Sequence, residues 1–182
     1  ESEGAYTSVG WKEQEDLKAA VKYLKSRNDI NYNKIGAIGF SLSASTMLMT
    51  KTDIKAIVAD SPYANLDNMI KQSYRIFHGF TKMPFVWLTK IFAKTFLGLN
   101  TYEISPEKSI KKIGIPVLLI HGEKDSQIPA ENSRLIYESS NKNITELWII
   151  KNAEHGQAYA INSKKYEERV IGFFDKYLQA GG

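Results

Sequence analysis

The sequence predicts an α/β domain with a mainly parallel sheet of about four strands, and two observations carry this prediction. First, continuous apolar runs of strand length alternate with stretches whose apolar residues recur at helical spacing. Continuous runs suit strands that are buried on both faces, and their alternation with helices is typical of βαβ units. Second, polar loops follow several of these strands, at the edge where open α/β sheets place their sites.

The first expected element is a helix over residues 11–26. Its apolar residues follow a helical period at Leu17, Ala20, Val21 and Leu24. Acidic residues precede them and basic residues follow, which matches the helix macrodipole. We therefore expect a surface helix packed on the sheet, then a polar turn region and a first strand over 35–40.

This strand ends in Gly39-Phe40-Ser41-Leu42-Ser43, which is the G-x-S-x-G nucleophile elbow with serine in place of the second glycine. A tight strand-to-helix turn would expose the Ser41 hydroxyl above a helix N-terminus. The backbone N–H of Leu42 would then face the oxygen that becomes negative in acyl transfer. The competing interpretation is a buried strand that simply leads into a helix rich in small residues.

A second buried strand is expected over 54–59, closed by Asp60-Ser61-Pro62, and after it the alternation breaks. Residues 63–112 hold five of the eight phenylalanines, and eight basic residues against three acidic ones. Helical stretches over 66–78 and 85–97 predict an inserted lid with an apolar inner face and a basic outer face. Two other interpretations stay open: the aromatic residues fill a small core of the lid itself, or the helices lie on a membrane surface.

The alternation then resumes to the end of the chain. Strands are expected over 115–120 and 146–150, and helices over 130–140 and 163–178. We see no linker or repeat, so the prediction is one domain over residues 1–182 with the lid inserted at about 63–112.

Composition excludes several classes of function. The net charge is +4, and no basic run is interleaved with aromatic residues as in a nucleic-acid interface. There is no cysteine, so disulfides and a cysteine nucleophile are excluded. No apolar run is long enough to span a bilayer. Because the chain begins at Glu1, we expect that an upstream portion is absent.

Three loop motifs together resemble the α/β-hydrolase superfamily. The elbow is followed by His121-Gly122-Glu123-Lys124-Asp125, similar to the H-G-x-x-D acid loop, and by Glu154-His155-Gly156, similar to the histidine loop. Their order, nucleophile, acid, histidine, is that of the superfamily. The resemblance implies that Ser41 attacks an acyl carbon, His155 transfers the proton, and Asp125 orients the imidazole. Within the superfamily the chain is most similar to bacterial serine-aminopeptidase-like esterases, which are often exported or membrane-anchored.

Other residues compete for these roles. Asp60 also ends a strand and is the rival acid, because some members of the fold carry the acid there. His121 is expected to be structural, bonded to nearby loop backbone, and His78 to be a lid residue. The three histidines show no metal-ligand spacing, so neither a metal nor a cofactor is expected.

The resemblance also predicts what this chain lacks. The superfamily sheet usually has eight strands, and only the last four are recognisable here, without the loop that supplies the second oxyanion donor. The strand over 35–40 would then have an unpaired edge, which predicts self-association unless residues 6–11 cover it.

The expected function is a serine hydrolase that cleaves an ester or amide of a small acyl substrate. The alternative is a truncated or degenerate hydrolase that binds a ligand or self-associates without efficient catalysis.

Overall fold

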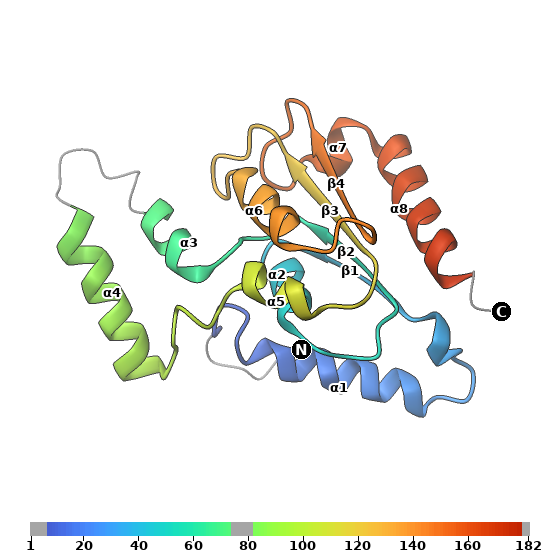
Figure 1. Ribbon diagram of the computed structural model, residues 1–182, viewed down its shortest axis with the longest axis horizontal. Helices are drawn as coiled ribbons and strands as arrows, with labels where there is room; N and C mark the ends of the chain where they lie inside the picture. The colour runs from blue at the N-terminus through green and yellow to red at the C-terminus, as the bar shows by residue number, and fades with distance from the viewer. Residues whose placement is uncertain (1–6, 74–81, 180–182) are drawn as a thin grey trace.

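A computed structural model describes residues 7–73 and 82–179 of the chain. Within these ranges, one parallel sheet contains β1 (Gly36–Phe40), β2 (Ala56–Asp60), β3 (Val117–Gly122) and β4 (Thr145–Ile150). Their spatial order is the sequence order, β1-β2-β3-β4 (Figure 1). Parallel neighbours need crossover connections, and helices lie in all three of them. The predicted α/β fold with a four-stranded parallel sheet is confirmed.

The two middle strands, β2 and β3, are buried at every position. Ile57 pairs with Val117 and Ala59 with Leu119 across the parallel ladder. Because helices cover both faces of the sheet, the side chains before the carboxyl ends of these strands lie in apolar surroundings, which explains the apolar runs Ala56–Ala59 and Val117–Ile120.

The strand β1 lies at the edge of the described sheet, where it pairs with β2 alone. Its Ile38 and Phe40 side chains are about half exposed. Residues 7–11, the described part of the segment considered as a cover, pack elsewhere: Val9 packs against the core cluster that contains Tyr63, and its carbonyl accepts a hydrogen bond from the Tyr63 hydroxyl at 2.6 Å. The edge of β1 therefore stays open in the described chain, and self-association through it stays a prediction.

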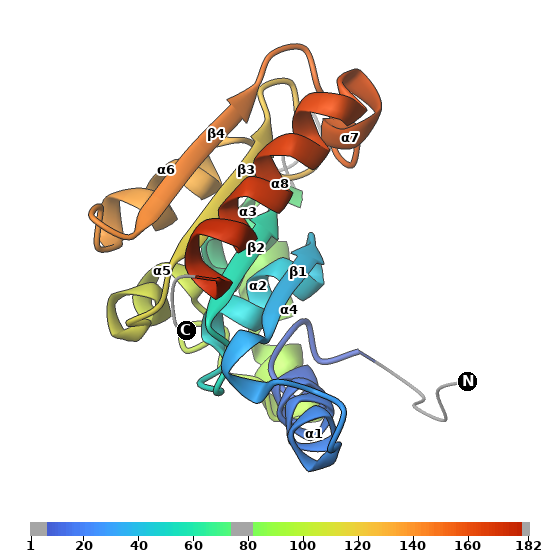
Figure 2. The same ribbon diagram turned by 90° about the vertical axis from the view of Figure 1, so that its right-hand side faces the viewer.

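Two helical layers enclose the sheet. Helices α1 (Glu13–Ser26), α2 (Leu42–Met49) and α6 (Glu131–Ser139) contribute to the core on one face, and α8 (Ser163–Leu178) packs on the other. Figure 2 shows α8 on one side of the strands and α6 on the opposite side. Each layer buries an apolar stripe, represented by Val21 in α1 and by Val170 and Phe173 in α8.

Helix ends agree with local sequence signals. The first turn of α1 carries three acidic residues and its last turn carries Lys25, as the macrodipole favours. The Asn162 side chain accepts a hydrogen bond from the Lys165 N–H at 3.0 Å and caps α8. These helices were predicted at nearly the observed positions. The short helix α7 (Ala158–Ile161) and the 3₁₀ turn Tyr32–Lys34 were not predicted.

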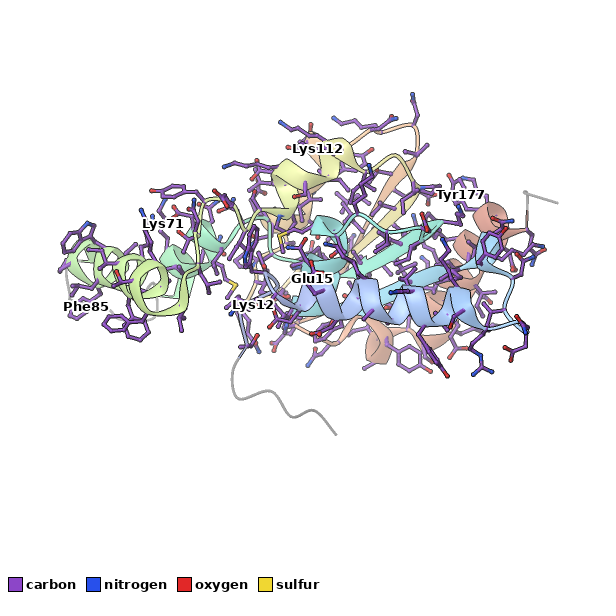
Figure 3. The ribbon with its side chains drawn as sticks, turned by 90° about the horizontal axis from the view of Figure 1, so that it is seen from below. Lys12, Glu15, Lys71, Phe85, Lys112 and Tyr177 are labelled. Atoms are coloured by element: carbon purple, nitrogen blue, oxygen red, sulfur yellow. The ribbon has the colours of Figure 1, made fainter. Side chains whose placement is uncertain are left out.

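Residues between β2 and β3 form the helical excursion expected as a lid. It contains α3 (Leu66–Ser73), α4 (Lys82–Leu97), α5 (Pro106–Ser109) and a 3₁₀ turn at Ile110–Lys112. Figure 1 and Figure 3 show α3 and α4 extending away from the sheet. The end of the helix predicted over 66–78, with His78, lies outside the described residues.

Helix α4 starts three residues earlier than predicted, at Lys82. Pro84 does not prevent this start, because the first N–H groups of a helix have no partner within it. Gly98, at φ +66°, follows the last residue of α4 in the left-handed conformation that commonly ends helices. No helix in the described ranges combines the length and hydropathy needed to cross a bilayer.

Candidate active site

Ser41 lies on the tight turn between β1 and α2. Its backbone is strained, at φ 54° and ψ −113°, a conformation that side chains rarely adopt outside functional turns. The Ser41 N–H donates to the Asp60 carbonyl at 2.8 Å, which ties the turn to β2. A Cβ atom at Gly39 would lie 3.0 Å from the backbone of both Ser43 and Ala44, so glycine at this position lets the strand and helix approach closely.

His155 reaches Ser41 from the loop after β4, 114 residues along the chain. The His155 Nε2 atom lies 3.2 Å from the Ser41 Oγ atom, and the Nδ1 atom lies 2.7 Å from the Asp125 Oδ2 atom. The Phe40 ring packs on the imidazole with centroids 4.8 Å apart. Gly156 has φ +74°, and a side chain there would press on Phe40. The loop therefore fixes the imidazole between the serine and the carboxylate.

Asp125 lies in the loop between β3 and α6 and is almost completely buried. Its Oδ1 atom accepts hydrogen bonds from the N–H groups of Gln127, at 3.0 Å, and Ile128, at 2.7 Å. Burial works to raise the pKa of Asp125, but hydrogen bonds from His121 and His155 outweigh it and hold the pKa below its usual range. The carboxylate is thus ionised and held rigidly beside the imidazole.

His121 is fully buried beneath this loop. Its Nε2–H donates to the Ile128 carbonyl at 2.7 Å and lies 3.3 Å from Asp125 Oδ2, while Nδ1 accepts from the Ser133 hydroxyl at 2.7 Å. The carbonyl only accepts, so Nε2 carries a proton. The expected bond to loop backbone is confirmed. The contact with Asp125 was not predicted. The closeness of the two residues in sequence, at the end of one strand and in the loop after it, is the signal that could have indicated it.

Asp60, the rival acid, has other partners. Its carboxylate accepts hydrogen bonds from the Ser61 hydroxyl at 2.8 Å and from the Tyr166 hydroxyl at 2.9 Å. Burial raises the pKa of Asp60, and the two neutral hydroxyls only partly offset this. The imidazole Nδ1 meets Asp125, so the structure brings together Ser41, His155 and Asp125.

Leu42 is the first residue of α2. The first hydrogen bond of this helix runs from the Ser45 N–H to the Ser41 carbonyl at 3.1 Å. The earlier N–H groups have no partner four residues back and sum to the positive end of the helix dipole. An anion that forms next to Ser41 would therefore face donors from α2.

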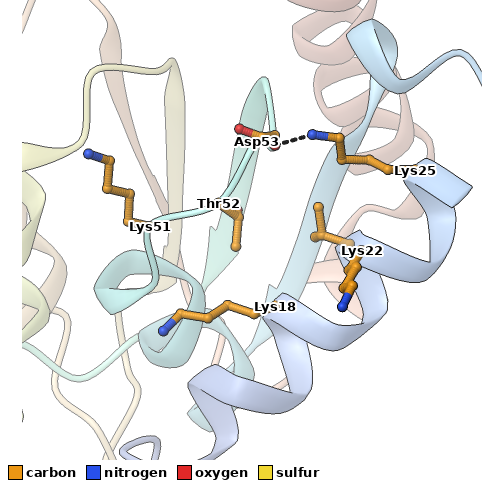
Figure 4. Close-up of a pocket in the computed structure, with 7 residues that line it drawn as sticks. Lys18, Lys22, Lys25, Lys51, Thr52 and Asp53 are labelled. Atoms are coloured by element: carbon orange, nitrogen blue, oxygen red, sulfur yellow. Dashed lines mark hydrogen bonds and ion pairs between the residues drawn. The ribbon is translucent and has the colours of Figure 1, made fainter.

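The described residues contain no group of three or more histidine, aspartate or glutamate side chains arranged to hold a metal ion. One groove of about 470 Å³ is lined by Lys18, Lys22, Lys25, Lys51 and Asp53, between α1 and the loop before β2 (Figure 4). In that groove Lys25 pairs with Asp53. No residue of the Ser41 constellation lines it.

The chain is similar in sequence to a known family and to two curated proteins. The model of the prolyl oligopeptidase family matches residues 3–181. The uncharacterized protein YqkD of Bacillus subtilis (strain 168) is 31% identical over 180 residues, which are 96% of this chain and 58% of that protein. The uncharacterized protein YfhR of Escherichia coli (strain K12) is 25% identical over 166 residues, which are 87% of this chain and 51% of the YfhR chain.

Solved structures show the same fold. The Pyrococcus furiosus esterase Pf2001 superposes with a TM-score of 0.73 at 32% identity, over 96% of this chain and 66% of that one. The Pyrococcus horikoshii acylaminoacyl peptidase gives a TM-score of 0.68 at 18% identity, over 93% of this chain and 28% of the peptidase chain. This similarity supports the fold alone. The chain spans less than two thirds of the length of these relatives. Its fold is that of the α/β-hydrolases, as the sequence motifs predict, and the match over nearly the whole chain shows that it belongs to the prolyl oligopeptidase family.

Proposed function

We propose that the protein is a serine hydrolase that cleaves ester or amide acyl bonds through Ser41, His155 and Asp125. The observation that supports this most directly is the continuous chain of hydrogen bonds from the Ser41 hydroxyl through the imidazole to the buried carboxylate, at 3.2 and 2.7 Å. The family match and the esterase name of a structural relative at 32% identity support the same reaction class.

In the proposed reaction, His155 Nε2 takes the hydroxyl proton as Ser41 Oγ attacks the acyl carbon. The carbonyl oxygen becomes negative and accepts a hydrogen bond from the Leu42 N–H at the start of α2. The imidazolium then gives its proton to the leaving alcohol or amine, and the carbon–heteroatom bond breaks. An acyl-enzyme on Ser41 remains.

Water completes the cycle by the same steps. His155 takes a proton from water, the hydroxide attacks the acyl carbon, and the proton returns to Ser41 Oγ as the acid leaves. Asp125 does not accept the proton in either half. It holds Nδ1–H, and so keeps Nε2 free to act as the base, and its charge stabilises the imidazolium.

A fluorophosphonate probe tests this proposal on the full-length protein. We expect covalent labelling of Ser41 and hydrolysis of p-nitrophenyl acetate, both abolished by Ser41→Ala. Ser43→Ala is the matched control, because Ser43 is an exposed serine two residues away, and it should retain both. A folded full-length protein that takes no label and turns over no ester would refute the proposal and favour a degenerate hydrolase that only binds.

A further inference from the structure

Phe40 is the last residue of β1 and directly precedes Ser41. Its ring packs against the His155 imidazole, with the two centroids 4.8 Å apart and the ring planes tilted by 44°. The same ring also faces the next residue of that loop, since a Cβ atom at Gly156 would lie 3.2 Å from the Phe40 Cζ atom. One side chain of β1 therefore lies against two consecutive residues of the loop after β4.

The two hydrogen bonds of the His155 ring restrain some of its motions more than others. Its Nδ1 atom lies 2.7 Å from Asp125 Oδ2, and its Nε2 atom lies 3.2 Å from Ser41 Oγ. The N–H and the lone pair of an imidazole lie in the ring plane, so these bonds fix the ring best within that plane. They resist less strongly a tilt of the ring about the line through its two nitrogens. A bulky group packed against the ring opposes this tilt, and Phe40 is such a group.

Core packing does not account for the position of Phe40. Its side chain is 45% exposed, and that of Ile38, two residues earlier on the same face of β1, is 53% exposed. A side chain that served mainly to fill the core would be buried, as every residue of β2 is. Phe40 stands beside Ser41 and against the imidazole, whereas Ile38 lies two residues farther from the turn. The contact with His155 is therefore the feature that distinguishes Phe40 on this strand.

We propose that Phe40 is a positioning residue, which holds the His155 imidazole in line between Asp125 and Ser41. In this role it acts through His155 and makes no contact with the reacting atoms. The kinetic consequence rests on the proposed function: because His155 moves a proton in both half-reactions, a tilted imidazole slows acylation and deacylation alike. A misplacement of about 1 Å can cost about a hundredfold in rate.

Kinetics of the full-length protein with p-nitrophenyl acetate test the proposal. Phe40→Ala should lower kcat and kcat/KM in equal proportion, by about tenfold to a hundredfold, with KM nearly unchanged. The rate of fluorophosphonate labelling at Ser41 should fall with them, because the probe needs the same proton transfer. Phe40→Tyr keeps the ring and should recover most of the loss. Ile38→Ala is the matched control, because it removes a half-exposed apolar side chain from the same face of β1, and it should keep the wild-type kcat.

Proton NMR of the same variants tests the contact whether or not the protein is active. The Phe40 ring current shifts the carbon-bound proton signals of the His155 imidazole, which are assigned by their absence in His155→Gln. These signals should move in Phe40→Ala and stay in place in Ile38→Ala. Signals that do not move in Phe40→Ala would overturn the proposal.

The kinetic outcomes separate this proposal from the proposed function. If wild-type protein is active, the positioning role is overturned by an unchanged kcat in Phe40→Ala or by an equal loss in Ile38→Ala. A raised KM at constant kcat would also overturn it, and would make Phe40 a substrate contact. No ester turnover by wild-type protein would instead refute the proposed function, and the NMR signals alone would then decide whether Phe40 holds the imidazole.

Discussion

Two aspartates lie at the carboxyl edge of neighbouring strands, Asp60 as the last residue of β2 and Asp125 in the loop after β3, and they differ in what surrounds them. Asp125 and Asp60 are 4% and 6% exposed, so the two carboxylates are buried almost equally. Asp125 has two backbone N–H donors and two imidazoles, whereas Asp60 has the hydroxyls of Ser61 and Tyr166. The pKa of Asp125 is lowered and that of Asp60 is raised.

Burial works to raise the pKa of both carboxyl groups; the imidazole and backbone N–H donors outweigh it at Asp125, whereas two neutral hydroxyls do not outweigh it at Asp60. An orienting acid must stay ionised to stabilise an imidazolium, and this requires the environment of Asp125. Asp60 instead ties the end of β2 to α8 through Tyr166. The strand position alone does not distinguish these two roles.

The largest expected effect separates the two aspartates directly. Asp125→Asn should lower kcat by about 10⁴-fold, because an amide stabilises the wrong imidazole tautomer and carries no charge. Asp60→Asn should lower it less than about tenfold, since its oxygens bond to Ser61 and Tyr166 rather than to the imidazole. Ester hydrolysis by the two full-length variants, with circular dichroism to check folding, makes the comparison. Similar losses in both would mean that Asp60 shares the orienting role.

The second effect concerns the buried donor to Asp125. His121→Leu removes the bonds to Ser133, Ile128 and Asp125 together, and leaves buried polar groups unpaired. We expect a loss of about 2 kcal/mol in the free energy of unfolding, measured with urea. His121→Gln keeps an N–H that can reach the Ile128 carbonyl, and it should restore part of this stability. If both variants were as stable as wild type, His121 would not hold the loop.

The sequence predicted which residues meet at the carboxyl edge of the sheet, but not the other contacts that these loops make. The three loop motifs and the buried strands are each contiguous in sequence. They can therefore be recognised one after another along the chain. Contacts such as Tyr166 with Asp60 join residues 106 positions apart, and no local pattern specifies them. Likewise, helical spacing predicted α4, but its large apolar side chains Leu88, Phe92 and Phe96 are exposed in the described chain, so the expected apolar inner face stays a prediction. Periodicity gives a helix its faces but does not say which one the rest of the chain will cover.

A smaller effect tests the tie between Asp60 and α8. Tyr166→Phe removes one hydroxyl donor while keeping the ring that packs near Trp148, at a centroid distance of 6.2 Å. We expect a loss of about 1 kcal/mol in unfolding free energy and no change in kcat. Tyr159→Phe is the matched control, because its hydroxyl bonds the exposed Glu167 and should contribute much less. A large loss of kcat in Tyr166→Phe would connect Asp60 to catalysis after all.

The smallest effect lies in the pH dependence of stability, where the two aspartates should have opposite signs. Stability rises with pH wherever the unfolded chain binds more protons than the folded one. The folded pKa of Asp125 is lowered, so its contribution is complete above the ordinary value of about 3.9 and is lost as the pH falls through the folded value. The folded pKa of Asp60 is raised, so its contribution is present below about 3.9 and declines as the pH rises toward the folded value.

Asparagine does not titrate, so each substitution removes one of these slopes. Relative to wild type, Asp60→Asn should therefore gain unfolding free energy as the pH rises above about 3.9, and Asp125→Asn should lose it as the pH rises toward that value. Urea denaturation of both variants and wild type between about pH 3 and pH 7 measures the two differences. Slopes of the same sign would show that neighbouring donors do not separate the two carboxylates.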